Sequence, residues 1–355
     1  MNRDGNQTED RRCAGPGARR RTSPTVAPLG RTKGHVTPTD PSCPVGPAFD
    51  DNREMALAPV VEALCAVTEG MARAKMRGQC RRALPSPATL TEMVEDLRAV
   101  LFPGYFGISD LGQESMRFYV GATLDRVFGV LQEQIARGLC FACRDDPHSC
   151  PDVTQSALVI TKEFVARLPT IRHLLATDVQ AAFRGDPAAK TPEEAIFCYP
   201  GVLAITNYRL AHELHRLGVP LIPRIITEYA HRITGIDIHP GARIGQEFFI
   251  DHGTGVVIGE TCIIGNRVRI YQGVTLGAKS FPLDEQGHPI KGIDRHPIVE
   301  DDVIIYSGAT ILGRVTIGRG STIGGNVWLT HSVPPGSRIT QAQVRDATFE
   351  EGAGI

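Results

Sequence analysis

The sequence predicts an α+β protein, in which an N-terminal all-α helical domain is followed by a parallel β-helix in the C-terminal third. Three observations lead to this prediction. Hydrophobic residues recur every six positions after residue 236, glycine follows many of them, and a period near 3.6 dominates the preceding stretch. At 355 residues the chain is long enough for two domains.

The N-terminal half divides into two stretches. Residues 1–50 are rich in Pro, Arg and Gly and have almost no aliphatic pattern, so we expect a disordered extension. Residues 51–235 show helical spacing, as in Leu90, Met93, Val94 and Leu97, and Pro and Gly separate the periodic runs. We expect six to eight helices here, which serve in oligomerisation and contribute part of a substrate site.

The six-residue period extends over residues 236–336. The periodic positions are Ile238, Ile244, Ile250, Ile258, Ile264, Ile270, Leu276, Val299, Ile305, Ile311, Ile317, Ile323 and Leu329. The period slips by two residues after Ile250 and breaks between Ala278 and Pro297, where polar sequence intervenes. Each hexapeptide forms one side of a coil, so we expect four to five coils that bury their aliphatics against one another. Residues 337–355 form a flexible tail.

Composition excludes several classes of protein. The net charge is −1, so no global field favours nucleic acid or a membrane surface. No apolar stretch approaches the roughly 20 residues that span a bilayer, and the N-terminus lacks the apolar core of a secretory signal. The nine cysteines are not arranged as a disulfide framework. We therefore expect a cytoplasmic protein.

Ionisable residues interrupt the apolar rhythm in three segments, namely 237–240 (DIHP), 251–255 (DHGTG) and 294–297 (DRHP). An imidazole beside a carboxylate is a common general base, because the acid fixes the tautomer and stabilises the imidazolium. Each histidine alone could equally be a satisfied surface residue at a coil corner. Three such segments around one long loop favour a catalytic site.

Residues 235–275, GIDIHPGARIGQEFFIDHGTGVVIGETCIIGNRVRIYQGVT, resemble the serine acetyltransferases of the left-handed β-helix acyltransferase class. The upstream segments FRGDPAAKTPEEAIFCYPG and YRLAHELHRLG, and the later DRHP and VPPG, fit the same family. The resemblance covers roughly residues 150–336. It implies a left-handed β-helix and acetyl transfer from acetyl-CoA to the hydroxyl of L-serine, in cysteine biosynthesis.

The resemblance also implies roles for individual residues. His252 matches the catalytic base and Asp237 its acidic partner in a dyad. The substrate-binding residues that it implies are Asp186, Asp251, Arg295, His296 and Glu260, the last without a specified role. Carboxylates would hold the ammonium group of the amino acid, and Arg295 and His296 its carboxylate. Alternatively, Asp186 is a helix N-cap and Glu260 a structural turn residue.

Acetyl-CoA in this class lies along the coils. The corresponding cofactor-binding positions are Gly277, Ala278, Lys279, Ser307 and Gly308, where small residues admit a close ligand. Glycine also recurs simply to turn coils, and Lys279 could be a solvated loop residue. No metal is required. The cluster of Cys140, Cys143, His148 and Cys150 could hold zinc, although ordinary thiols are the simpler interpretation.

The family also implies partners. Its sites lie between neighbouring subunits of a trimer, and some members pair trimers into hexamers, so we expect a homo-oligomer. A C-terminal Ile355 matches the tail by which members dock into O-acetylserine sulfhydrylase, although a frayed tail is the simple alternative.

Three other functions stay open at this point. One is another hexapeptide-repeat acyltransferase. A second is a zinc-dependent γ-type carbonic anhydrase, for which His239, His252 and His296 could supply ligands. The third is a non-catalytic scaffold.

Overall fold

The computed structural model describes residues 57–66, 82–108, 110–142, 152–280 and 282–341. The expected extension 1–50, three of the four residues of the possible zinc cluster (Cys143, His148 and Cys150) and the C-terminal Ile355 lie outside these ranges. Residues 64–355 form one compact unit, and the architecture below belongs to it, except for the short helix at residues 57–66, most of which precedes this unit.

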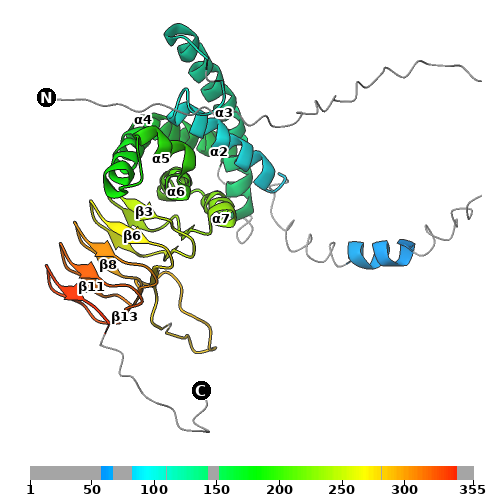
Figure 1. Cartoon of the computed structure of the whole chain (residues 1–355). Helices are drawn as coiled ribbons and strands as arrows, with labels where there is room; N and C mark the ends of the chain where they lie inside the picture. The colour runs from blue at the N-terminus through cyan, green and yellow to red at the C-terminus, as the bar shows by residue number, and fades with distance from the viewer. Residues whose placement is uncertain (1–56, 67–81, 109, 143–151, 281, 342–355) are drawn as a thin grey trace, which may run out of the picture. The chain divides into compact units, whose positions relative to one another are not determined.

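A helical layer precedes the β-helix, as predicted (Figure 1). A short helix spans residues 57–66, and six more follow: α2 (Pro87–Leu101), α3 (Gln113–Ala142), α4 (Val153–Gly185), α5 (Pro192–Cys198), α6 (Pro200–Arg216) and α7 (Ile222–Thr234). Side-chain caps fix several starts; Ser86, for example, accepts a hydrogen bond from the Thr89 amide at 3.3 Å. The seven helices of the described residues lie within the six to eight expected.

The six-residue period forms a parallel β-helix, which confirms the predicted fold class. Its strands are β1 (Asp237–Ile238), β2 (Arg243–Ile244), β3 (Phe249–Asp251), β4 (Val257–Ile258), β5 (Ile263–Ile264), β6 (Arg269–Tyr271), β7 (Thr275–Gly277), β8 (Ile298–Val299), β9 (Ile304–Ile305), β10 (Thr310–Leu312), β11 (Thr316–Ile317), β12 (Thr322–Ile323), β13 (Trp328–Leu329) and β14 (Arg338–Ile339). They form three parallel sheets, ordered β1-β4-β7-β10-β13, β11-β8-β5-β2 and β14-β12-β9-β6-β3. We call the first of these the front sheet.

The strand register gives the number of residues in each coil. In the front sheet the inward residues Ile238, Ile258, Leu276, Ile311 and Leu329 are aligned, so successive coils contain 20, 18, 35 and 18 residues. The ordinary coil therefore has 18 residues. The first coil carries two extra residues at the slip of the period, and the third carries 17 extra (35 − 18) in the long loop, which projects from the stack in Figure 1.

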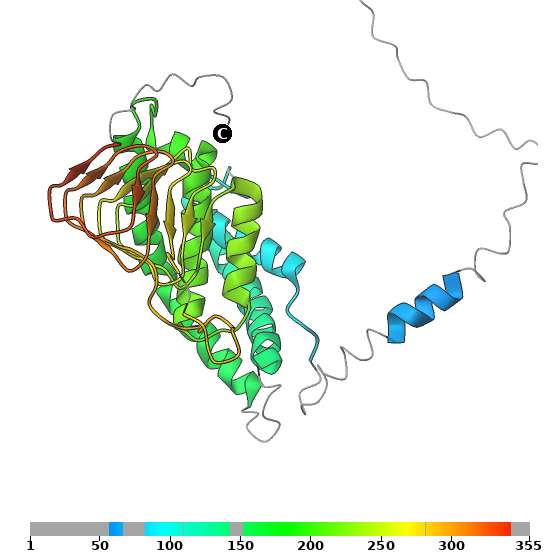
Figure 2. The ribbon, with the colours of Figure 1, turned by 90° about the horizontal axis from the view of Figure 1, so that it is seen from below.

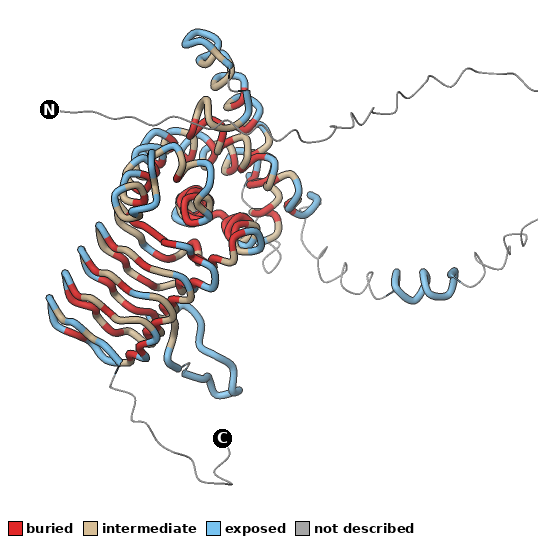
Figure 3. The backbone as a smooth tube through the Cα atoms, viewed as in Figure 1, coloured by how far each residue is buried: buried red, intermediate tan, exposed pale blue. Residues whose placement is uncertain are grey.

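The helices cover the first coil and share its core. One continuous cluster of buried side chains runs from Leu90 of α2 to Val333 beyond the last front-sheet strand (Figure 3). Figure 2 shows the helices beside the coils from a second direction. At the junction, a side-chain carbon added at Gly201 would lie 2.4 Å from the Ile250 carbonyl oxygen, so α6 can approach β3 only because it carries a glycine there.

A buried ion pair joins the helices to the first coil. The Arg209 guanidinium of α6 donates to both carboxylate oxygens of Asp178 in α4, at 2.6 and 2.9 Å, and to the Gly245 carbonyl at 2.8 Å. The Phe248 amide also donates a hydrogen bond to the Asp178 carboxylate, at 3.0 Å. Both charged side chains are at most 4% exposed. The pair therefore fixes α4, α6 and the coil in one arrangement.

Among the described residues, no helix combines the length and apolar character that crossing a membrane requires.

Candidate active site

The first coil has a distorted corner where the chain enters the front sheet. At this corner each later coil places one residue at positive φ: Gly273, Gly308 and Asn326, to which Gly255 corresponds in the first coil. The first coil adds His252 (φ +58) and Gly253 (φ +86). A non-glycine residue in this conformation is strained, and such strain gathers at functional sites. The two-residue slip of the hydrophobic period is thus the sequence signal that marks His252.

His252 is presented to solvent from this corner, which we call the His252 edge (residues 251–256). Its side chain is 70% exposed, whereas that of Asp251 is 11% exposed. The Nδ1 atom lies 3.8 Å from Oδ1 of Asp251, and Oδ2 of Asp251 accepts a hydrogen bond from Arg269 at 3.1 Å. The imidazole therefore turns Nδ1 toward a carboxylate that is itself held in place, and Nε2 is left to exchange a proton.

The helical domain places Asp186 near this edge. Asp186 is the C-cap of α4, and its carboxylate accepts hydrogen bonds from the Tyr199 hydroxyl at 2.5 Å and the Ala188 amide at 2.8 Å. These bonds, aided by the charges of Arg269 and His252, lower the pKa of Asp186. Asp186 is therefore ionised at neutral pH and lies in the electrostatic field of His252.

Tyr199 and Arg269 were not predicted as site residues. Burial, followed by the neighbouring Asp186, raises the pKa of Tyr199, so it remains a hydroxyl donor. Arg269 lies one coil above Phe249 in the parallel register and reaches Asp251 from there. The six-residue register could have identified it, because equivalent positions on successive coils are neighbours.

Asp237 makes no hydrogen bond or ion pair with its expected partner His252 within the described part of the chain. Its carboxylate instead faces α7, where Glu228 and His231 place ligand atoms within 4.8 Å. Burial raises the pKa of Asp237, while the charges of His231 and Arg224 oppose the shift. The dyad thus stays a prediction.

Arg295, His296 and Glu260 come together at the opposite edge of the front sheet. We call it the loop edge; it comprises residues 259–262 and the loop end 294–297. The Arg295 guanidinium donates to Glu260 at 2.7 Å, while His296 is only 6% exposed and accepts a hydrogen bond from the Thr261 amide at 3.1 Å. The two edges are separated by strand β4, and no described hydrogen bond or ion pair joins them.

Two histidines are held neutral, His296 of the loop edge and His239, which follows β1 one coil earlier. Burial lowers the pKa of His296 to about 4, and the Arg295 and Arg314 charges act in the same direction. Burial, followed by the charge of Arg224, likewise lowers the pKa of His239 to about 4. Within one chain His239, His252 and His296 form no common metal-ligand group; the described residues contain one cluster of three candidate ligands, Glu228, His231 and Asp237.

The five expected cofactor residues divide between the same two edges. Gly277, Ala278 and Lys279 lie where the long loop leaves β7, and Lys279 is exposed. Ser307 and Gly308 lie at the His252 edge two coils on, where Gly308 has a φ of +69° and turns the coil. A side-chain carbon at Gly308 would also fall 2.2 Å from the Asn326 side-chain oxygen, so glycine is required there for structure alone.

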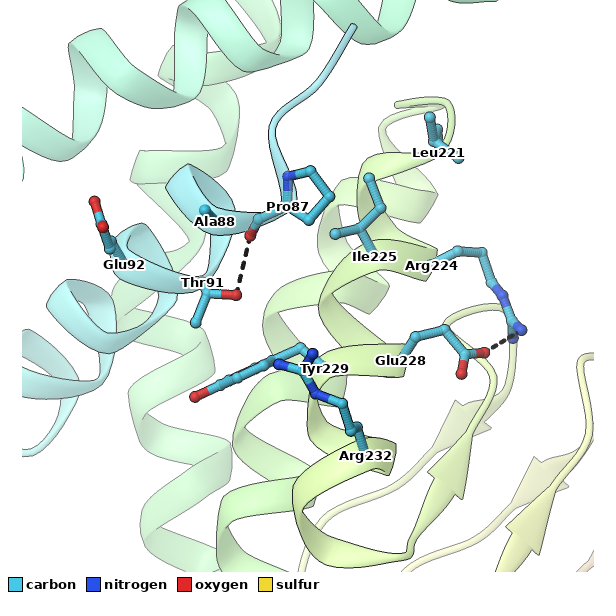
Figure 4. A pocket seen from close by; sticks show the side chains of 10 residues that line it. All are labelled: Pro87, Ala88, Thr91, Glu92, Leu221, Arg224, Ile225, Glu228, Tyr229 and Arg232. Atoms are coloured by element: carbon cyan, nitrogen blue, oxygen red, sulfur yellow. Dashed lines mark hydrogen bonds and ion pairs between the residues drawn. The ribbon is translucent and has the colours of Figure 1, made fainter. Parts of the chain in front are cut away.

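A cavity of about 780 Å³ between α2 and α7 contains none of the predicted site residues (Figure 4). It is lined by apolar side chains such as Ile225 and by the charged Arg224, Glu228 and Arg232. Figure 4 shows Arg224 and Glu228 paired at its side. The predicted site thus does not coincide with this pocket of the single chain, because its residues lie on two separate edges of the front sheet.

Comparison with known proteins first defines the class. The bacterial transferase hexapeptide (six repeats) family matches residues 296–331, so the coils are those of a hexapeptide-repeat transferase. The plasmid serine acetyltransferase of Synechococcus elongatus is 58% identical over 275 residues, which are 77% of this chain and 86% of that protein. The serine acetyltransferase of Mycobacterium tuberculosis is 50% identical over 162 residues, 46% of this chain and 67% of its own.

Solved structures agree with these sequences. The crystal structure of Entamoeba histolytica serine acetyltransferase 1 in complex with L-cysteine matches with a TM-score of 0.62 and 35% identity, covering 74% of this chain and 90% of that one. The chain belongs to the serine acetyltransferase family, and the resemblance seen in the sequence is thereby confirmed.

Proposed function

We propose that the chain transfers the acetyl group of acetyl-CoA to the hydroxyl of L-serine, with His252 as general base. The observation that carries the assignment is the His252 edge, where an exposed imidazole on a strained corner is flanked by the two carboxylates Asp251 and Asp186. Positive φ alone also occurs at ordinary coil corners such as Arg267 and Asp302, so the assignment rests on the two inserted residues, His252 and Gly253, together with the carboxylates beside the imidazole.

The reaction requires one proton shuttle. Nε2 of His252 takes the proton from the serine hydroxyl as its oxygen attacks the thioester carbonyl carbon. A C–O bond forms and the carbonyl becomes an oxyanion in a tetrahedral intermediate. When the carbonyl re-forms, the C–S bond breaks, the imidazolium returns its proton to the leaving sulfur, and O-acetyl-L-serine and CoA are released. A carboxylate beside Nδ1, which is Asp251 in the single chain, stabilises the imidazolium between these steps.

The charges of the two edges suit an amino-acid substrate. Asp186 and Asp251 would hold the ammonium group beside His252, and Arg295 with His296 would donate to the carboxylate. Two solved Entamoeba histolytica serine acetyltransferases are complexes with cysteine, which differs from serine by one atom. We therefore infer that cysteine competes with serine for this site.

A complete site needs two copies of the chain. The His252 edge and the loop edge lie on opposite sides of the front sheet, so one copy cannot close both around a small amino acid. If the His252 edge of one copy faces the loop edge of the next, the same contact repeats around a ring. A homotrimer, or a hexamer of paired trimers, would supply this arrangement. We infer that Asp237 takes the place of Asp251 beside Nδ1 of His252 in the assembled site, which frees Asp251 to hold the ammonium group.

Acetyl-CoA would lie along the same interface. Gly277 and Ala278 leave space for the thioester, Lys279 is free to meet a CoA phosphate, and Ser307 and Gly308 line the other edge. We infer further that the C-terminal Ile355 binds O-acetylserine sulfhydrylase, and that both proteins act in the cytoplasm. Glu260 acts through Arg295, whose guanidinium it holds at 2.7 Å.

The acceptor profile tests the proposed reaction. Purified full-length protein with acetyl-CoA should release free thiol when L-serine is added, at a kcat/KM at least ten-fold above that for homoserine, threonine or a sugar acceptor. The reason is that both edges must engage one small zwitterion. Thiol release is followed with a chromogenic disulfide, and mass spectrometry identifies O-acetyl-L-serine. Equal turnover of a sugar acceptor would refute the assignment.

Subunit complementation tests the shared site. At a serine concentration far below the KM of Arg295→Ala, His252→Asn and Arg295→Ala should each show little activity alone, whereas co-expressed chains should recover roughly a quarter of wild-type activity. In random trimers about three quarters are mixed, and each mixed trimer has one intact interface of three. Two different affinity tags isolate the mixed assemblies. Mixed assemblies that remain as inactive as the parents would place both edges of the site in one chain.

A further inference from the structure

The Thr261 side chain contacts the C-terminal end of the long loop, at residues 295 and 296. It precedes β5 on the second coil, 34 residues before Arg295. Its hydroxyl oxygen accepts hydrogen bonds from the Arg295 amide at 2.9 Å and from the His296 amide at 3.1 Å. The same hydroxyl lies 2.9 Å from Nδ1 of His296. One side chain thus contacts both members of the predicted carboxylate-binding pair.

These contacts fix the tautomer of His296. The Thr261 amide donates to Nδ1 at 3.1 Å, so Nδ1 carries a lone pair and no hydrogen. A neutral imidazole with a bare Nδ1 carries its hydrogen on Nε2. The Thr261 hydroxyl accepts two amide hydrogens, and its own hydrogen is directed at Nδ1, so every hydrogen-bonding capacity of the hydroxyl is used. His296 is therefore a neutral donor through Nε2.

The ring of His296 is also held sterically. A side-chain carbon added at Gly259 would lie 2.0 Å from Cδ2 of the ring, so the imidazole packs directly on the glycine backbone. Burial lowers the pKa of His296 to about 4, which keeps the ring neutral. Orientation and protonation are thus both determined before any substrate arrives.

Arg314, which lies on the fourth coil, also forms hydrogen bonds with the backbone of Thr261 and His296. Its guanidinium donates to the Thr261 carbonyl at 2.6 Å and to the His296 carbonyl at 3.0 Å. A third bond reaches the Asp294 carboxylate at 3.1 Å. The backbone of the loop end is therefore anchored by Arg314, while the contacts that set the His296 ring and the Arg295 amide belong to Thr261.

We propose that Thr261 is a positioning residue for serine binding: its hydroxyl holds Arg295 in place and fixes His296 as the Nε2–H donor that receives the substrate carboxylate. The inference rests on the proposed function, in which Arg295 and His296 bind that carboxylate. It assigns the hydroxyl a role in substrate affinity and none in the proton transfer at His252.

Thr261→Val tests the proposal, because it keeps the branched shape and removes the hydroxyl. We expect the KM for serine to rise about ten-fold, from the loss of the hydrogen bonds at Arg295 and His296. The kcat at saturating serine and the KM for acetyl-CoA should change less than two-fold. Thr261→Ser, which restores the hydroxyl, should return the serine KM to within about three-fold of wild type. Initial rates with each substrate varied separately give kcat and both KM values for each variant.

Two controls make the outcome decisive. Thr322→Val changes an outward threonine of β12 whose hydroxyl makes no hydrogen bond in the described part of the chain, and it should leave both KM values unchanged. If Thr261→Val does not fold, Thr261→Ala replaces it, with a melting curve to verify the fold.

Arg295→Ala separates the two hypotheses. A raised serine KM in Arg295→Ala, together with an unchanged value in Thr261→Val, overturns the role of Thr261 and leaves the proposed function intact. An unchanged serine KM in Arg295→Ala overturns the carboxylate pair itself, and the role of Thr261 with it. A raised KM that Thr261→Ser fails to restore also overturns the proposal, because the defect then follows shape and not the hydroxyl.

Discussion

Replacing His252 by Asn is expected to lower kcat at least about 100-fold, because the general base of the proposed reaction is lost. Asparagine is the suitable replacement, since it tolerates the positive φ of this corner better than most residues and cannot accept the serine proton. Because the side chain is 70% exposed, the melting temperature should hardly change. Thiol release at saturating serine and acetyl-CoA, with a melting curve of each protein, measures both quantities. His252→Ala should lose activity to a similar extent.

His288 provides a matched control for this substitution. It lies in the long loop, its side chain is 76% exposed, and its Nδ1 is 3.8 Å from the Asp284 carboxylate, the same separation as between His252 and Asp251. His288→Asn should retain nearly full activity, because an exposed imidazole beside a carboxylate is not sufficient for catalysis. Near-normal kcat in His252→Asn, or an equal loss in both variants, would rule out His252 as the base.

Replacing Asp178 by Asn is expected to destabilise the protein by about 3–5 kcal/mol. The Arg209 guanidinium would then be a buried charge without its counterion. For a unit of this size the loss corresponds to a fall in melting temperature of about 10 °C. Differential scanning calorimetry at one fixed protein concentration measures it, which matters because assembly also contributes to apparent stability. Activity below the transition should be reduced only if the junction between α4 and β3 shifts Asp186.

Asp96→Asn is the control for burial. Asp96 also receives two hydrogen bonds from one arginine, Arg126, at 2.7 and 3.1 Å, but the Arg126 side chain is 60% exposed. Solvent screens such a pair, so its loss should lower the stability by less than about 1 kcal/mol. Equal melting temperatures for the two variants would show that the buried pair does not hold the helices to the first coil.

The stacked coils could be predicted from the sequence because their cause is local and repeated. An aliphatic residue every six positions can be buried only if each coil lies on the next, and Ile258, Leu276 and Ile311 meet in the register that this rule requires. The break before Pro297 likewise predicted the long loop, and the slip after Ile250 could have marked the His252 corner.

Contacts between elements could not be predicted in the same way. The spacing of Asp186 and Tyr199 in the sequence does not predict the hydrogen bond between the Tyr199 hydroxyl and the Asp186 carboxylate. This contact depends on how α4 and α6 pack against each other. Arg269 and Thr261 carry no motif that distinguishes them from other polar residues on outward positions. Their roles depend on which side chains the neighbouring coil places within reach.

The sequence alone determined the repeat, its three-sided coils and the histidines that could be catalytic, because periodic burial is a property of the chain itself. Only the tertiary structure decided that the candidate residues divide between two edges of one sheet, with His252 and Asp186 on one and Arg295 and His296 on the other. The physical reason is that the chain turns a corner before and after each short strand. Residues eight positions apart along the chain, such as His252 and Glu260, therefore lie on opposite edges of the sheet.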